Sequence, residues 1–169
     1  DYALGRFFSK DFDDDFEKEL AEFIDLNTAT WVSEIDETTR KRLAKVIDNS
    51  YNDGLSVEAT GVALRNTVIG MGVYRANLIS RTEVHRVAGF ANEAVAINMK
   101  ITGTVKEWVA IQDERTRITH SFAAGQRVAL EQPFIVGGEK LKYPGDPMGS
   151  AAETINCRCA SIYITPDFL

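Results

Sequence analysis

Cysteine and histidine are scarce in this chain of 169 residues, which contains two of each. The two cysteines, Cys157 and Cys159, are separated by a single residue. A disulfide across that gap would be strained, because bridged residues need a particular separation and side-chain geometry. We therefore expect reduced thiols or metal ligands, and a reducing compartment such as the cytoplasm during synthesis.

Long apolar runs and an excess of positive charge are also missing. No stretch of eighteen apolar residues occurs, so we expect no membrane span. The formal net charge is −6. General affinity for nucleic acid is therefore not expected, because it comes from Lys and Arg displacing counterions from phosphate. A local basic patch is still compatible with this average.

The rest of the composition is that of a globular protein, with 44% apolar and 26% charged residues. The length suits one domain, or one domain with a helical appendage. Since the sequence begins at Asp1 and not at methionine, we interpret it as a fragment or a processed product. It has no internal repeat and no low-complexity tract.

The first hundred residues have the apolar spacing of helices. The predicted helices are one from about Phe12 to Ile24, one that begins after Ser33 and ends at Gly54, one capped by Ser56, and one from about Tyr74 to Lys100. The last of these would be about 40 Å long at ~1.5 Å per residue, which is enough to act as a spine.

The character of the sequence changes after Gly103. Gly137-Gly138 separates the segments 134–136 and 139–142, as in a two-residue hairpin. The predicted strands are 105–111, 127–130, 134–136, 139–142 and 158–164, with a short helix at 116–124. The fold class is therefore α+β, with an N-terminal helical stem and a long spine helix, followed by a small mixed α+β C-terminal unit with antiparallel strands.

Residues that bind soft metals are concentrated in the second half. Cys157 and Cys159 would point to the same side of an extended strand, and His120 could join them in a partial ligand set for tetrahedral zinc. His85, Asp113 or water could supply the fourth ligand.

Two alternatives explain the same residues. The cysteines could be small buried apolar side chains, with His120 donating a structural hydrogen bond. A catalytic cysteine–histidine pair is the other alternative, with Arg158 stabilising the thiolate. No orienting third group can be identified for it.

A second cluster is charged. Asp113, Arg115 and Arg117 alternate at the start of the predicted short helix, and Arg81 and Glu83 on the long helix are their expected partners. We interpret these five as a structural ion-pair cluster that locks the C-terminal unit onto the long helix. The alternative is a set of Arg and His side chains that faces the phosphate of a nucleic acid or nucleotide.

Taken in order, the motifs of the chain resemble the phage head-morphogenesis family, also called Mu protein F-like minor head proteins. The likeness covers roughly residues 74–164. Its motifs are Ile79-Ser80-Arg81-Thr82-Glu83, Trp108-Val109, Asp113-x-Arg115-Thr116-Arg117-x-x-His120, Gly125-Gln126, Pro133-Phe134, Gly137-Gly138-Glu139-Lys140, Tyr143-Pro144-Gly145-Asp146 and Asn156-Cys157-Arg158-Cys159.

The resemblance implies a helical stem over 1–72 and a Mu F-like head-morphogenesis domain over 73–169. It implies a minor structural protein of a tailed-phage virion, assembled in the host cytoplasm in few copies or as an oligomer. The implied partners are portal and capsid or scaffold proteins, and packaged DNA. Many members of the family carry cysteines at the positions of Arg117 and His120, in a form that looks like a zinc site. His120 can replace one such ligand, whereas Arg117 cannot.

Two other functions stay open. A nucleotide-processing, nuclease-like or toxin-like enzyme would use His120, Arg117 and Glu83, and these groups should then converge in an open cleft. A DNA-binding module would need a basic face. The candidate residues for that face are Arg115, Arg117, Arg127, Lys140 and Lys142.

Overall fold

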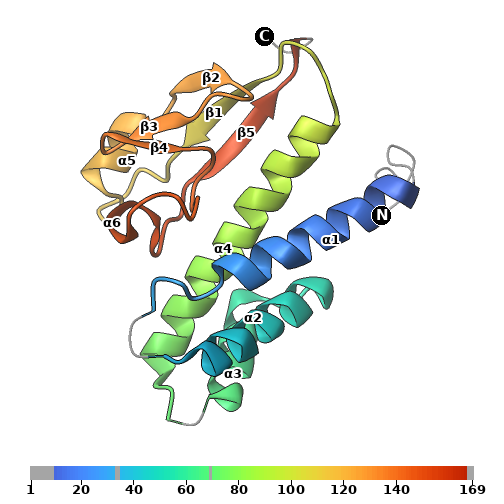
Figure 1. The fold of residues 1–169 in the computed structure, drawn as a ribbon. Helices are drawn as coiled ribbons and strands as arrows, with labels where there is room; N and C mark the ends of the chain where they lie inside the picture. The colour runs from blue at the N-terminus through green and yellow to red at the C-terminus, as the bar shows by residue number, and fades with distance from the viewer. Residues whose placement is uncertain (1–9, 33–34, 69, 167–169) are drawn as a thin grey trace.

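A computed structural model describes residues 10–32, 35–68 and 70–166. Within these residues, four helices are followed by a unit of short strands and short helices (Figure 1). The helices are α1 (Lys10–Asn27), α2 (Glu37–Asn52), α3 (Val57–Thr67), α4 (Val73–Asn98), α5 (Ile118–Ala123) and α6 (Ala151–Thr154). The strands are β1 (Val105–Val109), β2 (Arg127–Ala129), β3 (Phe134–Val136), β4 (Glu139–Leu141) and β5 (Ala160–Ile164). The α+β fold class is confirmed.

Two of the predicted helix ends in the helical part are confirmed. Ser56 caps α3, since its side chain accepts a hydrogen bond from the Ala59 amide. Gly54 follows α2 with a φ of 64°, as expected for a left-handed residue after a helix. The cap of α2 is Asp36. The predicted start after Ser33 falls on a residue outside the described ones.

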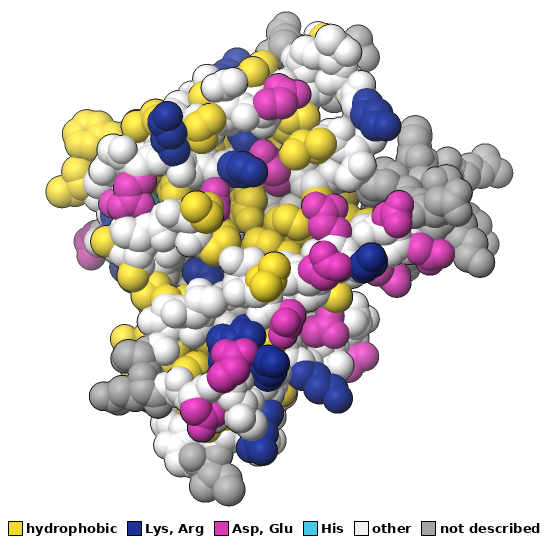
Figure 2. All heavy atoms as spheres, viewed as in Figure 1, with side chains coloured by type: hydrophobic (Ala, Val, Ile, Leu, Met, Phe, Trp, Pro, Cys, Tyr) yellow, Lys and Arg dark blue, Asp and Glu magenta, His cyan; other side chains and the backbone are white. Residues whose placement is uncertain are grey.

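One hydrophobic core lies among these four helices. Its buried leucines and isoleucines are Leu20, Ile24, Leu43, Ile47, Leu64 and Ile79. Outside this core, α1 carries exposed acids at 14, 15, 17, 19, 22 and 25. Figure 2 shows these carboxylates gathered along α1 on one face of the molecule. Their exposure is that of a solvated helix face.

The C-terminal unit contains two small antiparallel sheets. Strand β1 lies between β2 and β5 in one, and β3 pairs with β4 in the other. The hairpin turn has a positive φ at both Gly137 and Gly138, 60° and 84°, which is the geometry that favours glycine in such turns. A second core of Trp108, Ala123, Phe134, Val136, Leu141 and the two cysteines fills this unit.

Helix α4 runs along both parts of the molecule, as Figure 1 shows. The loop at Tyr143 and Pro144 packs directly against it at Gly89. A Cβ at Gly89 would lie 2.8 Å from the Pro144 carbonyl oxygen, so glycine is needed for this close approach. No helix in the described ranges has the length and apolar character to cross a membrane.

Candidate functional site

The structure brings His120 and both cysteines together. His120 lies on α5, and its Nδ1 is 3.2 Å from the Cys159 sulfur and 3.7 Å from the Cys157 sulfur. All three residues are buried, and their ligand atoms lie within 4.8 Å of one another. The cysteines precede β5, which begins at Ala160 and not at Arg158 as predicted, because Asn156 turns the chain with a φ of 57°.

These separations fit a tetrahedral zinc ion. Zn–S bonds are about 2.3 Å and Zn–N bonds about 2.0–2.1 Å. In a tetrahedral site, the nitrogen of one ligand is therefore about 3.6 Å from the sulfur of another. The two His120–cysteine distances bracket that value. Little movement of His120, Cys157 or Cys159 would be needed to bind the metal.

Glu153 orients the histidine. Its Oε2 lies 3.0 Å from Nε2 of His120 and accepts a hydrogen bond of 2.8 Å from the Thr119 hydroxyl. An Nε2–H donated to this carboxylate leaves the Nδ1 lone pair facing the sulfurs. A carboxylate on the second nitrogen is the usual partner of a metal-binding histidine.

Sequence reasoning missed Glu153. It lies on the short helix α6, four residues before Cys157 in a segment with no recognisable motif. Only the folding of α6 against α5 reveals its role.

The two thiols lie close enough to shift each other's pKa. The hydrogen bond from Cys159 lowers the pKa of Cys157, with help from His120 and His85, and it outweighs the opposite effect of burial. The same hydrogen bond, together with burial, raises the pKa of Cys159. A cation bound here would replace any thiol proton, because cysteine binds metal as the thiolate.

Neither predicted candidate for a fourth ligand belongs to this group of three. The Asp113 carboxylate accepts hydrogen bonds of 2.7 and 2.6 Å from the Arg158 guanidinium. These bonds hold the pKa of Asp113 far below its ordinary value. His85 lies beside Cys157, and both line a surface cleft. Its Nε2 is buried without a hydrogen-bond partner among the described residues.

The five predicted ion-pair residues lie in separate places. Glu83 is buried in α4 and pairs with Arg86 at 3.4 Å. Asp113 pairs with Arg158. Arg117 donates a hydrogen bond to the Ile155 carbonyl oxygen. The two other predicted members, Arg81 and Arg115, are exposed.

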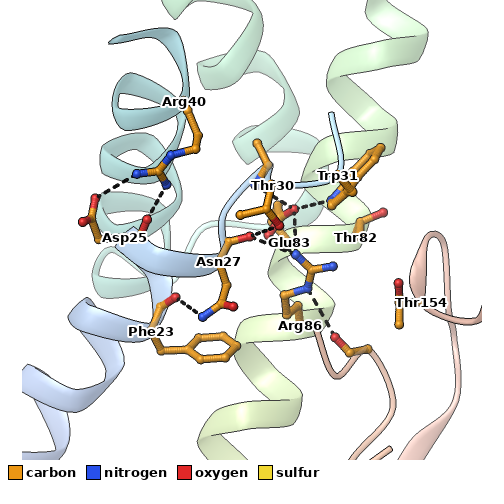
Figure 3. A network of polar contacts seen from close by, with 12 residues as sticks. Phe23, Asp25, Asn27, Thr30, Trp31, Arg40, Thr82, Glu83, Arg86 and Thr154 are labelled. Carbon is orange, nitrogen blue, oxygen red and sulfur yellow. Dashed lines mark hydrogen bonds and ion pairs between the residues drawn. The ribbon is translucent and has the colours of Figure 1, made fainter. Parts of the chain in front are cut away.

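Glu83 organises the junction between α1, α2 and α4. Its Oε1 accepts hydrogen bonds from the Trp31 indole at 2.7 Å and the Ala29 amide at 3.1 Å. Figure 3 shows Trp31 and Arg86 both directed at this carboxylate. Arg86 also donates to the carbonyl oxygens of Asn27 and Gly145. The three-residue spacing of Glu83 and Arg86 was the available signal for this pair.

A second buried ion pair, which was not predicted, joins α4 to β1. Nζ of Lys106 lies 2.5 Å from Oε1 of Glu93 and 2.7 Å from the Lys142 carbonyl oxygen. Tyr163 on β5 donates a hydrogen bond of 3.0 Å to the other oxygen of Glu93. Lys106 is fully buried, so its charge depends on these partners.

The enzyme hypothesis requires His120, Arg117 and Glu83 to meet in an open cleft. His120 is 2% exposed and Glu83 is 1% exposed, and they belong to different networks. Arg117 bonds a backbone carbonyl. The three residues therefore do not converge in one open cleft, as the enzyme hypothesis requires.

The chain has recognisable relatives. Residues 41–162 match the family described as Phage Mu protein F like protein. Minor head protein GP7 of Bacillus phage SPP1 is 36% identical over 102 residues, which are 56% of this chain and 31% of GP7. The NAD(+)–arginine ADP-ribosyltransferase EFV of Enterococcus faecalis is 32% identical over 93 residues, which are 51% of this chain and 18% of that protein.

The aligned region thus spans less than a third of either relative. No solved structure matches this chain. The family match extends from α2 to β5, and it includes His120, Glu153, Cys157 and Cys159. The chain belongs to the Phage Mu protein F-like family.

Proposed function

We propose that the chain is part of a minor head protein of a tailed phage and acts in head assembly within the virion. The observation that carries this proposal is the family match over residues 41–162. The similarity to a phage minor head protein supports it. Portal and capsid or scaffold proteins are the proposed partners, packaged DNA is a further one, and host cytoplasm is the proposed place of assembly.

The organisation proposed for this role has a helical stem over 1–72 and a head-morphogenesis domain over 73–169. The stem would present its outer face to other head proteins, and the domain over 73–169 would support the stem. The exposed acids of α1 support an assembly surface, since several of them gather over this helix (Figure 2). Such charge steers association and selects partners more than it adds affinity.

We further propose that His120, Cys157 and Cys159 hold a structural zinc ion. The short separations, the burial of all three side chains and the carboxylate on Nε2 of His120 support this site. Because Asp113 is engaged by Arg158, His85 or water would complete the coordination. The ion would tie α5 to the segment before β5 and so stabilise a small core.

The assembly role can be tested in the phage or prophage that encodes the chain. Removing residues 41–162 in frame should reduce the yield of infectious particles, because heads would lack a component. Heads would be counted by electron microscopy and their proteins identified by mass spectrometry. The matched control is the exposed substitution Glu114→Gln, which should leave infectivity unchanged. Normal heads and infectivity after the deletion would refute the proposal.

The metal site has a separate test. Elemental analysis of the purified protein, after loading with zinc and removal of free metal, should give about one zinc per chain. His120→Ala and Cys159→Ser should lose it, and thermal unfolding of the unchanged protein should shift upward on loading. His85→Ala distinguishes the fourth ligand, since only protein coordination by His85 would weaken binding. A zinc content near zero in the loaded protein would refute the site.

A further inference from the structure

A cleft with no assigned role lies where the helical part meets the C-terminal unit. Its volume is about 440 Å³, which is within the size range of sites that hold small ligands. The lining residues are Val57, Arg81, His85, Arg115, Asn156, Cys157 and Arg158. They come from α3, from α4 and from the segments that flank α5 and β5. No carboxylate is among them.

The charge of this cleft is opposite to that of the whole protein. Arg81 and Arg115 are exposed, and neither guanidinium has a hydrogen-bond or ion-pair partner within the described ranges. Arg158 is also in the lining, but its charge is balanced by Asp113. Two uncompensated positive charges therefore face one cleft in a chain whose formal charge is −6.

This pattern selects the chemical class of the ligand. Guanidinium groups donate paired N–H bonds to the oxygens of carboxylate or phosphate. A single carboxylate would neutralise only one of the two free arginines. An anion with at least two negative charges would neutralise both, and two linked phosphates carry that charge. Asn156 also lines the cleft, and its side-chain amide is a neutral hydrogen-bond donor for a phosphate oxygen.

We propose that this cleft binds two linked phosphate groups through Arg81 and Arg115. The phosphates could belong to a free nucleotide or diphosphate, or to successive positions of a nucleic-acid strand, because the recognising chemistry is the same. The site is independent of the head-assembly role. The cleft adjoins the proposed zinc site, since Cys157 and His85 also line it. The binding experiment therefore uses metal-free protein.

The experiment uses two probes with the whole chain. Inorganic pyrophosphate would be titrated by calorimetry, and a fluorescein-labelled single-stranded oligonucleotide by polarisation. Both titrations would be run on the unchanged protein and on Arg81→Gln, Arg115→Gln and Arg42→Gln. Arg42 is an exposed arginine on α2 outside the cleft, so it is the matched control. Circular dichroism melts would establish that each variant is folded.

Pyrophosphate should bind the unchanged protein, and each cleft substitution should weaken binding at least tenfold, with Arg42→Gln within twofold. Binding of pyrophosphate alone identifies a free phosphate compound as the source. Oligonucleotide binding that depends on the same two arginines identifies a strand. Its salt dependence should then have a slope of about −1.4 for two phosphates. Failure of both probes to bind, or equal weakening by Arg42→Gln, would overturn the proposal.

Discussion

The two parts of this molecule are stabilised in different ways. The buried side chains of the core among α1, α2, α3 and α4 are aliphatic or small apart from Met71, and the aromatic ones at its edge are only partly buried. The core of the C-terminal unit is smaller and contains a tryptophan, both cysteines and a neighbouring histidine. Apolar burial scales with the area removed from water, so the smaller unit gains less from it. The zinc ion proposed at His120, Cys157 and Cys159 would add to the stability of this unit.

Helix α4 belongs to both parts through buried charges. Glu83 faces the end of α1, and Glu93 faces Lys106 on β1. Burial raises the pKa of both carboxyls. Neither would remain ionised in such a place without its cationic neighbour. Helix α4 therefore connects the two parts, because each part contains one of its buried charges.

The largest effect is expected at Glu83. Glu83→Ala removes the carboxylate that pairs with Arg86 and leaves a buried guanidinium without its charge partner. Loss of one member of a buried pair costs about 3–5 kcal/mol, and urea unfolding would measure it. Glu19→Ala, at an exposed position on α1, should change the free energy of unfolding by less than about 0.5 kcal/mol. Equal effects of the two substitutions would contradict the role of Glu83.

Truncating one leucine in each core tests whether the parts unfold together. Leu43→Ala in the helical core and Leu141→Ala in the second core should each cost about 2–5 kcal/mol. Trp31 and Trp108 are the two tryptophans of the chain and report on one part each. Because α4 is shared, we expect the unfolding midpoints reported by the two tryptophans to fall by the same amount in either variant. If only the midpoint reported by the tryptophan of the substituted part fell, the two parts would unfold separately, as the predicted domain boundary near residue 72 implies.

Sequence reasoning predicted the elements better than the contacts. Periodicity located α4, and turn chemistry located the Gly137-Gly138 hairpin, because both depend on neighbours in the chain. The partner of Glu83 was expected to be in the Asp113 cluster. The structure pairs it with Arg86, one turn away, because the helix places both on the face that α1 covers.

The approach of His120 to the two cysteines agrees with what the motifs indicated. Glu153 and the Lys106–Glu93 pair had no local signal. Lys106 follows the alternation of a strand and points inward where an apolar residue is expected. Only the position of Glu93 across from β1 makes a lysine stable there, and that position is a property of the tertiary fold.

A moderate effect is expected when the orienting carboxylate is changed. Glu153→Gln keeps the size of the side chain but removes the charge that holds Nε2–H of His120. Changes to such partners lower metal affinity by about 10–100-fold. Competition for zinc with a chelating dye would measure the change. The control is Glu139→Gln, whose carboxylate bonds the Ser150 amide and not the histidine. If Glu139→Gln lowered the affinity for zinc as much as Glu153→Gln, Glu153 would have no specific role.

The smallest effect concerns the exposed pair of Asp113 and Arg158, and it depends on pH. The hydrogen bonds from Arg158 lower the pKa of Asp113 in the folded chain below its ordinary value of 3.8. The unfolded chain therefore takes up this proton first on acidification, so the pair stabilises the fold above about pH 4 and loses that contribution as the pH falls further. Asp113→Asn should lower the melting temperature slightly at neutral pH, since exposed pairs contribute little. The difference from the unchanged protein should shrink steadily below pH 4. Glu114→Gln, a neighbour without a charged partner in the described residues, should show no such trend. If the difference in melting temperature between Asp113→Asn and the unchanged protein stayed constant from pH 7 to pH 2, the side chain would act by its shape and its backbone hydrogen bonds. Its charge would then contribute nothing to the contact between the segment before α5 and the segment before β5.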